Sequence, residues 1–194
     1  LASLSQQQQY TKNQVVSGGG GTWDTGHMGL TLSNGDLTAS HPSADGYLGG
    51  RATELLSAGK HYFEVLIDPS SVAAGSINIG VADASFGTAE RLAVAGAFSW
   101  QGSGAHIIDG VYTSGYTAFA PGDVLMFAVD IDAGHLWLGK NNVWNEGDPG
   151  AGTGAIITTV PSNIYPALSC YTTGSIVAAR FSLADFDYTP PSGY

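Results

Sequence analysis

Charged residues are scarce in this chain: Asp, Glu, Lys and Arg make up 11% of its 194 residues, where about 25% is usual. Only 6 of them are Lys or Arg against 16 Asp or Glu, which leaves a formal net charge of −10. We predict no nucleic-acid partner, because phosphate binding requires a basic patch and so few scattered cations do not form one. The same balance disfavours an anionic membrane surface.

Cysteine and long apolar runs are also nearly absent. The single cysteine, Cys170, excludes an intrachain disulfide, and its apolar neighbours in "IYPALSCY" predict a buried thiol. The lack of disulfides favours assembly in a reducing cytosol. No apolar run approaches about 18 residues, so we expect no membrane insertion. The chain begins at Leu1 and shows no signal-peptide pattern, and we expect it to be part of a longer protein.

Glycine and two-residue alternation are what the sequence has in quantity, with 28 Gly. "LTLSNGDLTAS" carries Asn34-Gly35 between alternating segments, the signature of a β-hairpin. In "KHYFEVLID" both alternating sets are largely apolar, which predicts a strand covered on both faces. Residues 123–144 indicate two strands joined at Asp132-Ala133-Gly134. We predict an all-β protein in which two antiparallel sheets pack face to face.

The two ends of the chain differ from its middle. Residues 1–21 are polar and then glycine-rich, which predicts a connector or the end of a stalk, and residues 22–194 are expected to form one sandwich domain. "AERLAVAGA", within a loosely patterned region, is predicted to form one or two helical turns. The last residues, "YTPPSGY", predict an extended tail, because Pro-Pro cannot join a central ladder.

The order of these strand motifs resembles the SPRY domain family. The likeness lies in "GKHYFEVLID", "SINIGVAD", "GDVLMFAVDIDAGHLWLGKNNVW" and "NIYPALSCYTTGSIVAARF", and "LTLSNGDLTAS" matches the opening hairpin of the family. The resemblance implies a bent β-sandwich, a jelly roll of the concanavalin or lectin type. It also implies a non-catalytic recognition module that presents loops at one edge of the sandwich to a protein partner.

A finer resemblance concerns "NNVWNEGDPGAG" and "FDYTPPSGY", which are similar to the bacteriophage and bacterial branch of the family. It implies the host-receptor-binding domain of a phage tail fibre or spike, located on the virion tail, assembled in the host cytoplasm and exposed to the extracellular medium. The partner would be a host cell-surface protein or glycan, and that setting implies a possible homotrimer. Two alternatives remain: a cellular SPRY scaffold that binds a short peptide, and a glycan-active enzyme of lectin-like fold.

Catalytic and metal-binding patterns are weak. Glu64 and Asp68 share a strand face, but Leu66 stands where glucanases of this architecture carry a third carboxylate. Asp130 and Asp132 share a face without EF-hand spacing. Gly-x-Ser-x-Gly and zinc-binding spacings are missing. We therefore predict no catalytic residue, no metal ligand and no cofactor.

Aromatic and amide side chains between the strands are the candidate binding residues. Trp137, in mid-strand, is predicted to pack in the core, and Trp23 is predicted to anchor the first strand of the domain. Trp144 lies among amides in a predicted irregular loop that begins near Lys140. Tyr with Ser, Thr and Gly is the composition of adaptable recognition loops, and Trp and Tyr are common at binding hot spots. The predicted ligand-binding residues are Trp100, Gln101, Tyr112, Tyr116, Asn142, Trp144 and Asn145.

Overall fold

The computed structural model describes residues 21–42, 44–72 and 74–194. These residues form two antiparallel sheets of seven strands each and contain no helix. The strands are β1 (Trp23–Met28), β2 (Thr31–Ser33), β3 (Thr38–Ser40), β4 (Leu48–Ala52), β5 (Lys60–Ile67), β6 (Asn78–Ala82), β7 (Ala97–Gln101), β8 (Ala105–Ile108), β9 (Val111–Ser114), β10 (Val124–Asp130), β11 (His135–Lys140), β12 (Val143–Trp144), β13 (Tyr165–Cys170) and β14 (Ile176–Arg180). The predicted β-sandwich is confirmed.

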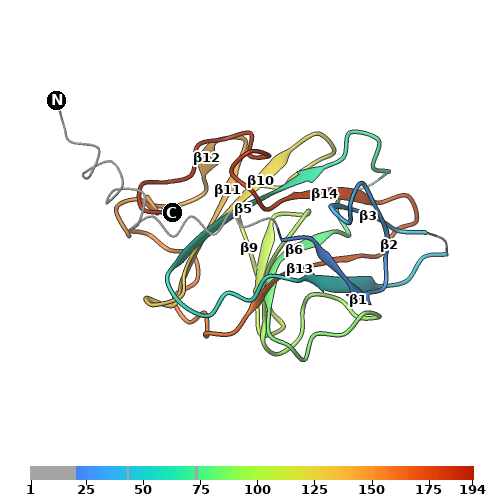
Figure 1. Cartoon of the computed structure of the whole chain (residues 1–194), viewed down its shortest axis with the longest axis horizontal. Helices are drawn as coiled ribbons and strands as arrows, with labels where there is room; N and C mark the ends of the chain where they lie inside the picture. Colours follow the sequence, from blue (N-terminus) through green and yellow to red (C-terminus); the bar gives the residue numbers. More distant parts are fainter. Residues whose placement is uncertain (1–20, 43, 73) are drawn as a thin grey trace.

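Strand order shows how segments far apart in the sequence become neighbours (Figure 1). Sheet A has the order β1-β4-β13-β6-β7-β8-β9, and sheet B has the order β12-β11-β10-β5-β14-β3-β2. β13 therefore lies between β4 and β6, and β5 lies between β10 and β14. The connections between the strands run over the outside, where they cover parts of both sheets. No helix among the described residues is long and apolar enough to span a membrane.

Turn chemistry fixes the hairpins. Asn34 and Gly35 both have positive φ (53° and 64°), and Ser33 pairs with Thr38 across the turn. Asn141 and Asn142 (51° and 65°) form a second tight turn between β11 and β12. Asparagine and glycine adopt this left-handed conformation at little steric cost. The predicted hairpins are confirmed. The prediction of an irregular loop directly after Lys140 is wrong, because the chain turns back at once into β12.

The main core lies between the two sheets and is built from the inner faces of most strands. Phe63 of β5 and Phe127 of β10 are directly paired across the ladder, and their rings stack with centroids 4.7 Å apart. Trp23 is fully buried, donates its indole N–H to the carbonyl of Leu37 (3.0 Å), and meets Phe181 edge-on. Cys170 is a free, buried thiol, as predicted, and burial raises its pKa to about 12.

Both faces of β5 are covered, as predicted. The outer face of sheet B carries a second apolar cluster, which includes Tyr62, Met126 and Trp137. Trp137 is buried as predicted, although it lies in this outer cluster. Phe186, Tyr188 and Tyr194 of the C-terminal segment, residues 181–194, cover this cluster together with Trp144 and Ala155. The prediction of an extended tail is wrong, because Tyr194 folds back and is only 3% exposed. Residues 1–20, which hold nearly all of the predicted connector, lie outside the described part of the chain.

Candidate interaction surfaces

A cation between two tyrosine rings marks the outer side of sheet A. The guanidinium carbon of Arg91 lies 4.9 Å from the ring centroid of Tyr112 and 5.2 Å from that of Tyr47. Tyr47 in turn meets Tyr171, with centroids 5.0 Å apart. Tyr112 and Tyr171 are 46% and 39% exposed. We refer to Tyr47, Arg91, Tyr112 and Tyr171 together as the Arg91 surface.

Long-range strand pairing brings the tyrosines of this surface together. Tyr47 precedes β4 and Tyr171 follows β13, and the two strands are adjacent because Leu48 pairs with Cys170. Tyr112 lies on β9, the strand at one edge of sheet A, and is paired with Ile107.

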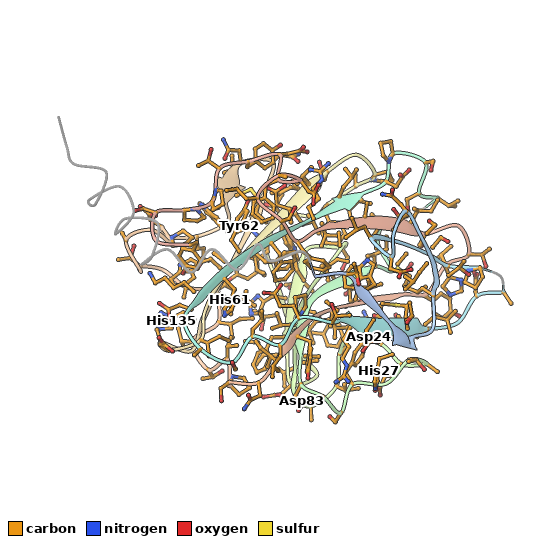
Figure 2. All side chains as sticks on the ribbon, viewed as in Figure 1. Asp24, His27, His61, Tyr62, Asp83 and His135 are labelled. Carbon is orange, nitrogen blue, oxygen red and sulfur yellow. The ribbon has the colours of Figure 1, made fainter. Side chains whose placement is uncertain are left out.

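Arg91 reaches the surface from residues 83–96, which cross the outer face of sheet A; Figure 2 labels Asp83, where the segment begins. The crossing segment is fastened by buried contacts to the sheet. The amide of Leu92 donates to the Ser169 hydroxyl (2.8 Å), and the Ser99 hydroxyl donates to the carbonyl of Leu92 (2.6 Å). Phe86 and Leu92 bury their side chains against small residues of the sheet. These contacts position Arg91 on the outer face of sheet A. The prediction of helical turns in this segment is wrong, because its few apolar side chains anchor it as a loop.

Arg91 has no acidic partner in the described part of the chain. Among the described residues, Lys60, Lys140 and Arg180 form ion pairs with carboxylates, whereas Arg91 forms none. Its Nε–H group is buried and donates to no acceptor among the described residues. Burial raises the pKa of Tyr112 despite the neighbouring cation, so its hydroxyl stays protonated and can donate. The Arg91 surface therefore offers positive charge, hydroxyl donors and ring faces.

The predicted binding residues do not form one site. Trp100 has no exposed surface: it packs edge-on against Phe119 and donates its indole N–H to the carbonyl of Thr117 (3.1 Å). We remove Trp100 from the candidate set, because a side chain without accessible surface presents nothing to a ligand. Gln101 is half-buried and donates to the carbonyl of Gly75 (3.1 Å). Tyr112 alone belongs to the Arg91 surface.

Two other candidates, Tyr116 and Asn145, lie along a rim where β8 and the loop after β9 meet the chain after β12. Tyr116 packs against His106, with ring centroids 4.5 Å apart. Burial, with the Glu146 carboxylate nearby, raises the pKa of Tyr116. Asn145, beside Glu146, keeps its side-chain nitrogen buried without a hydrogen-bond partner. The structure thus brings Tyr116 close to the chain at Asn145, as a shared binding role would require.

Asn142 and Trp144 lie outside both this rim and the Arg91 surface. Asn142 is exposed at the β11–β12 turn, and its backbone amide lies 3.1 Å from the sulfur of Met126. Trp144 is half-buried and lies over Gly139, with its ring 6.4 Å from that of Tyr62. Its indole is thus part of the cover of sheet B.

Glu64, the carboxylate of the glycan-active alternative, is a structural group. Its side chain has no exposed surface, and it accepts hydrogen bonds from the Tyr62 hydroxyl (2.7 Å) and from the backbone amides of Asp187 (2.8 Å) and Tyr188 (3.0 Å). A guanidinium nitrogen of Arg180 lies 3.4 Å from Glu64 Oε2. Burial and the bond to Glu64 raise the pKa of Tyr62 far above its ordinary value, so this phenol remains a donor. A substrate has no access to Glu64 in this arrangement.

Three other carboxylates and His27 also have local partners. Asp130 pairs with Lys60 (3.7 Å), and Asp132 accepts from the amide of Gly59 (3.0 Å). Asp24 pairs with His27 at the β1 edge, far from His61 in Figure 2. In the part of the chain that the structure describes, no group of three or more His, Cys, Asp and Glu side chains could hold a metal ion.

Two buried histidines make stability depend on pH. Burial lowers the pKa of His106 below its ordinary 6.5, outweighing the opposing effect of Glu146, and burial also lowers the pKa of His61. The unfolded chain therefore binds protons that the folded chain does not, and the free energy of unfolding should fall as the pH drops below 6.5. Urea unfolding curves above and below this pH would measure the decrease. His106→Gln should make it smaller; an unchanged pH dependence would contradict the assignment to His106.

The fold is that of SPRY domains. The SPRY domain of human HERC1 is similar over 86% of this chain and 99% of its own, with a TM-score of 0.66 and 18% sequence identity. A second human SPRY domain gives a TM-score of 0.65 at 17% identity over 81% of this chain and 98% of that one. The PSpry domain of TRIM65 gives 0.62 at 12% identity over 91% and 98%. No protein-family model and no curated protein matches the sequence.

Three residues of the Arg91 surface were not predicted as binding residues from the sequence: Tyr47, Arg91 and Tyr171. Each stands between strands, in "DGYLGG", "AERLAV" and "LSCYTTG". Tyrosine and arginine are the residue types most enriched at binding hot spots, and that enrichment was the available signal. Their convergence depends on strand order, which sequence alternation does not encode.

Proposed function

We propose that the protein is a non-catalytic interaction module that binds a segment of a partner protein through the Arg91 surface. The observation that carries the proposal is an arginine without a carboxylate partner among the described residues, held between the half-buried ring of Tyr47 and the exposed ring of Tyr112, in a chain of net charge −10. Arg and Tyr dominate binding energy at protein interfaces because they combine large contact area with fixed polar groups. The SPRY-like fold supports the same function by analogy.

The chemistry of the surface points to a partner segment with an acidic side chain. A carboxylate above Arg91 would form a charge-assisted pair, which is stronger than a neutral hydrogen bond. The hydroxyl of Tyr112, whose ring packs on Arg91, can orient polar groups, while the exposed rings of Tyr112 and Tyr171 can accept apolar ones. An acidic partner would also neutralise a cation that this acidic chain leaves unpaired.

Selection from a random peptide library on the immobilised protein tests the proposal. Enriched peptides should carry Asp or Glu, and Arg91→Ala should weaken their binding about thirtyfold, the effect of losing roughly 2 kcal/mol at a hot spot. Lys140→Ala is the matched control, because it removes one positive charge from sheet B, where Lys140 already pairs with Asp123. Peptides that bind the Arg91→Ala variant as well as the parent protein would contradict this choice of surface.

The biological setting is a finer proposal. We propose the host-receptor-binding domain of a phage tail fibre, supported by the sequence resemblance of residues 141–152 and 186–194 to the phage and bacterial branch. A host-surface protein or glycan as partner, location on the virion tail and a homotrimer all belong to this proposal. The likeness in fold to human SPRY domains favours the alternative of a cellular scaffold that captures a short peptide.

The flanking genes would distinguish these settings. Neighbouring genes for tail and baseplate proteins would support the virion setting, whereas ligase or coiled-coil sequences in the same reading frame would support the cellular scaffold. A glycan array provides a further test: glycan binding that survives Arg91→Ala would move the receptor site to the rim at Tyr116 and Asn145.

A further inference from the structure

The C-terminal segment lies on the outer face of sheet B as a separate strip of chain. Residues 181–194 form no strand, and their two backbone–backbone hydrogen bonds are local ones, from Asp185 to Ser182 and from Tyr194 to Pro191. Side chains of the sheet make the polar contacts that fasten it. We refer to the side chains beneath it as the Glu64 face: Tyr62, Glu64, Met126, Trp137 and Arg180.

Glu64 forms hydrogen bonds with the backbone of the segment. Its two carboxylate oxygens accept from two successive amides, those of Asp187 and Tyr188, and one of them also accepts from the Tyr62 hydroxyl. A buried carboxylate is destabilising unless it is paired and hydrogen-bonded. Two of the donors that satisfy Glu64 are therefore successive N–H groups of the chain above it, and the others are Tyr62 and Arg180. A proline at either position would remove one of the two amide donors.

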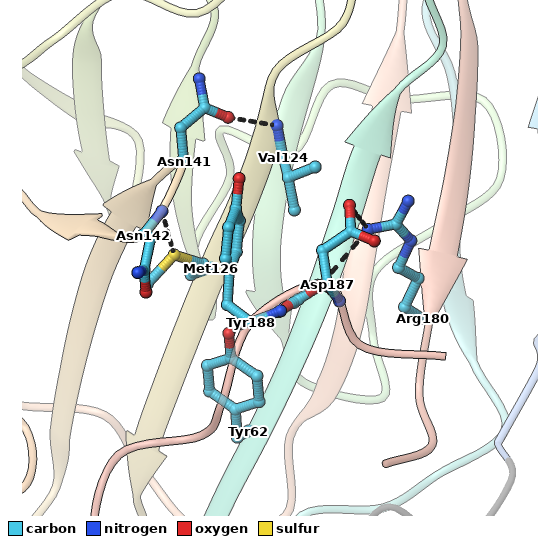
Figure 3. A network of polar contacts seen from close by, with 9 residues as sticks. Tyr62, Val124, Met126, Asn141, Asn142, Arg180, Asp187 and Tyr188 are labelled. Carbon is cyan, nitrogen blue, oxygen red and sulfur yellow. Dashed lines mark hydrogen bonds and ion pairs between the residues drawn. The ribbon is translucent and has the colours of Figure 1, made fainter. Parts of the chain in front are cut away.

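The side chains of residues 186–188 also contact the Glu64 face. Arg180 pairs with the carboxylate of Asp187 as well as with Glu64 (Figure 3). Phe186 meets Tyr62 edge-on, with ring centroids 4.9 Å apart. Tyr188 packs in the same apolar cluster. The Glu64 face thus fits an aromatic residue, an acidic residue and a second aromatic residue in succession.

A further contact lies at the end of the chain. The ring of Tyr194 lies 6.3 Å from that of Trp137, and the ammonium group of Lys60 stands 4.8 Å above it. Between Phe181 and these contacts, Leu183 is 59% exposed in a turn. The segment is therefore joined to the sandwich by an exposed connection and held to it by side-chain contacts, as a bound peptide would be.

We propose that the Glu64 face is a peptide-binding site for an aromatic–acidic–aromatic segment, that Phe186-Asp187-Tyr188 of the same chain is its internal ligand, and that the C-terminal segment of a second copy can take its place. Exchange of an identical element between copies requires no new contacts, because each copy supplies what the other gives up. This site lies on sheet B and is independent of the Arg91 surface on sheet A.

The test uses the full chain with a protease site inserted after Leu183. The protein is folded, cut and then mixed with excess fluorescent peptide of residues 184–194, and the label that elutes with the protein in size-exclusion chromatography is measured. The peptide should exchange into the cut protein. A peptide with Tyr188→Pro should bind at least about tenfold more weakly, because it lacks one of the two amide donors. A Glu64→Gln protein should lose affinity for the parent peptide.

Two results would overturn the proposal. One is a cut protein that keeps its circular dichroism spectrum but takes up no labelled peptide; the other is equal binding of the parent and the Tyr188→Pro peptides. The peptide comparison uses an unchanged protein, so it stays decisive even if Glu64→Gln fails to fold. Mixing two intact chains with different fluorophores at high concentration extends the test to a second copy, and energy transfer between them should appear and be competed by the parent peptide.

Discussion

Replacing Glu64 by Ala should lower the free energy of unfolding by about 3–5 kcal/mol, the range for breaking a buried, hydrogen-bonded charge pair. The change leaves Arg180 without one of its carboxylates and removes the acceptor of the Tyr62 hydroxyl and of the amides of Asp187 and Tyr188. Unsatisfied buried donors carry their full desolvation penalty. Urea denaturation followed by tryptophan fluorescence would measure the loss, since Trp137 lies under the same segment.

The control for this prediction is Glu146→Ala, which removes the same group from an exposed position. Substitutions at such sites usually change stability by no more than about 0.5 kcal/mol. A Glu64→Ala protein as stable as the Glu146→Ala protein would show that the C-terminal segment does not depend on the carboxylate, and the proposed reading of its backbone would fail as well.

Trp100→Ala should have an effect of similar size, a loss of about 3–5 kcal/mol, as is usual for truncating a large buried aromatic side chain. It removes the packing against Phe119 and the hydrogen bond to Thr117. Trp100→Phe should cost less, because most of the apolar volume remains and only the N–H donor is lost. Thermal or urea unfolding of the three proteins gives the comparison. A Trp100→Ala protein of unchanged stability that no longer binds the selected peptides would show that Trp100 is a binding residue.

The fold could be predicted from sequence because its signals are local. Asn34-Gly35 specifies its turn through two residues that accept positive φ. The alternation in β5 and β10 specifies which side chains share a face, and Phe63 and Phe127 do stack across the ladder. Trp100 shows the limit of the method: an aromatic residue beside glycine and serine suits a recognition loop, but its place at the end of β7 turns it inward.

The candidate surfaces could not be predicted because they depend on contacts between distant segments. Tyr47 and Tyr171 meet only because β4 pairs with β13, and no residue near either of them encodes that order. The tail was misread for a related reason. Pro190 and Pro191 correctly exclude a ladder, yet Tyr194 is buried by ring contacts with another part of the chain, which leave no periodic pattern.

The crossing segment that carries Arg91 has an evolutionary consequence. Its anchors are two serine hydroxyls and the side chains of Phe86 and Leu92, whereas its exposed positions make no contribution to either ladder. Exposed loop positions tolerate substitution and insertion far better than paired strands do. Descendants of this chain can therefore change the charge and length of the loop while inheriting an unaltered sandwich, so that new partners are acquired without refolding the scaffold.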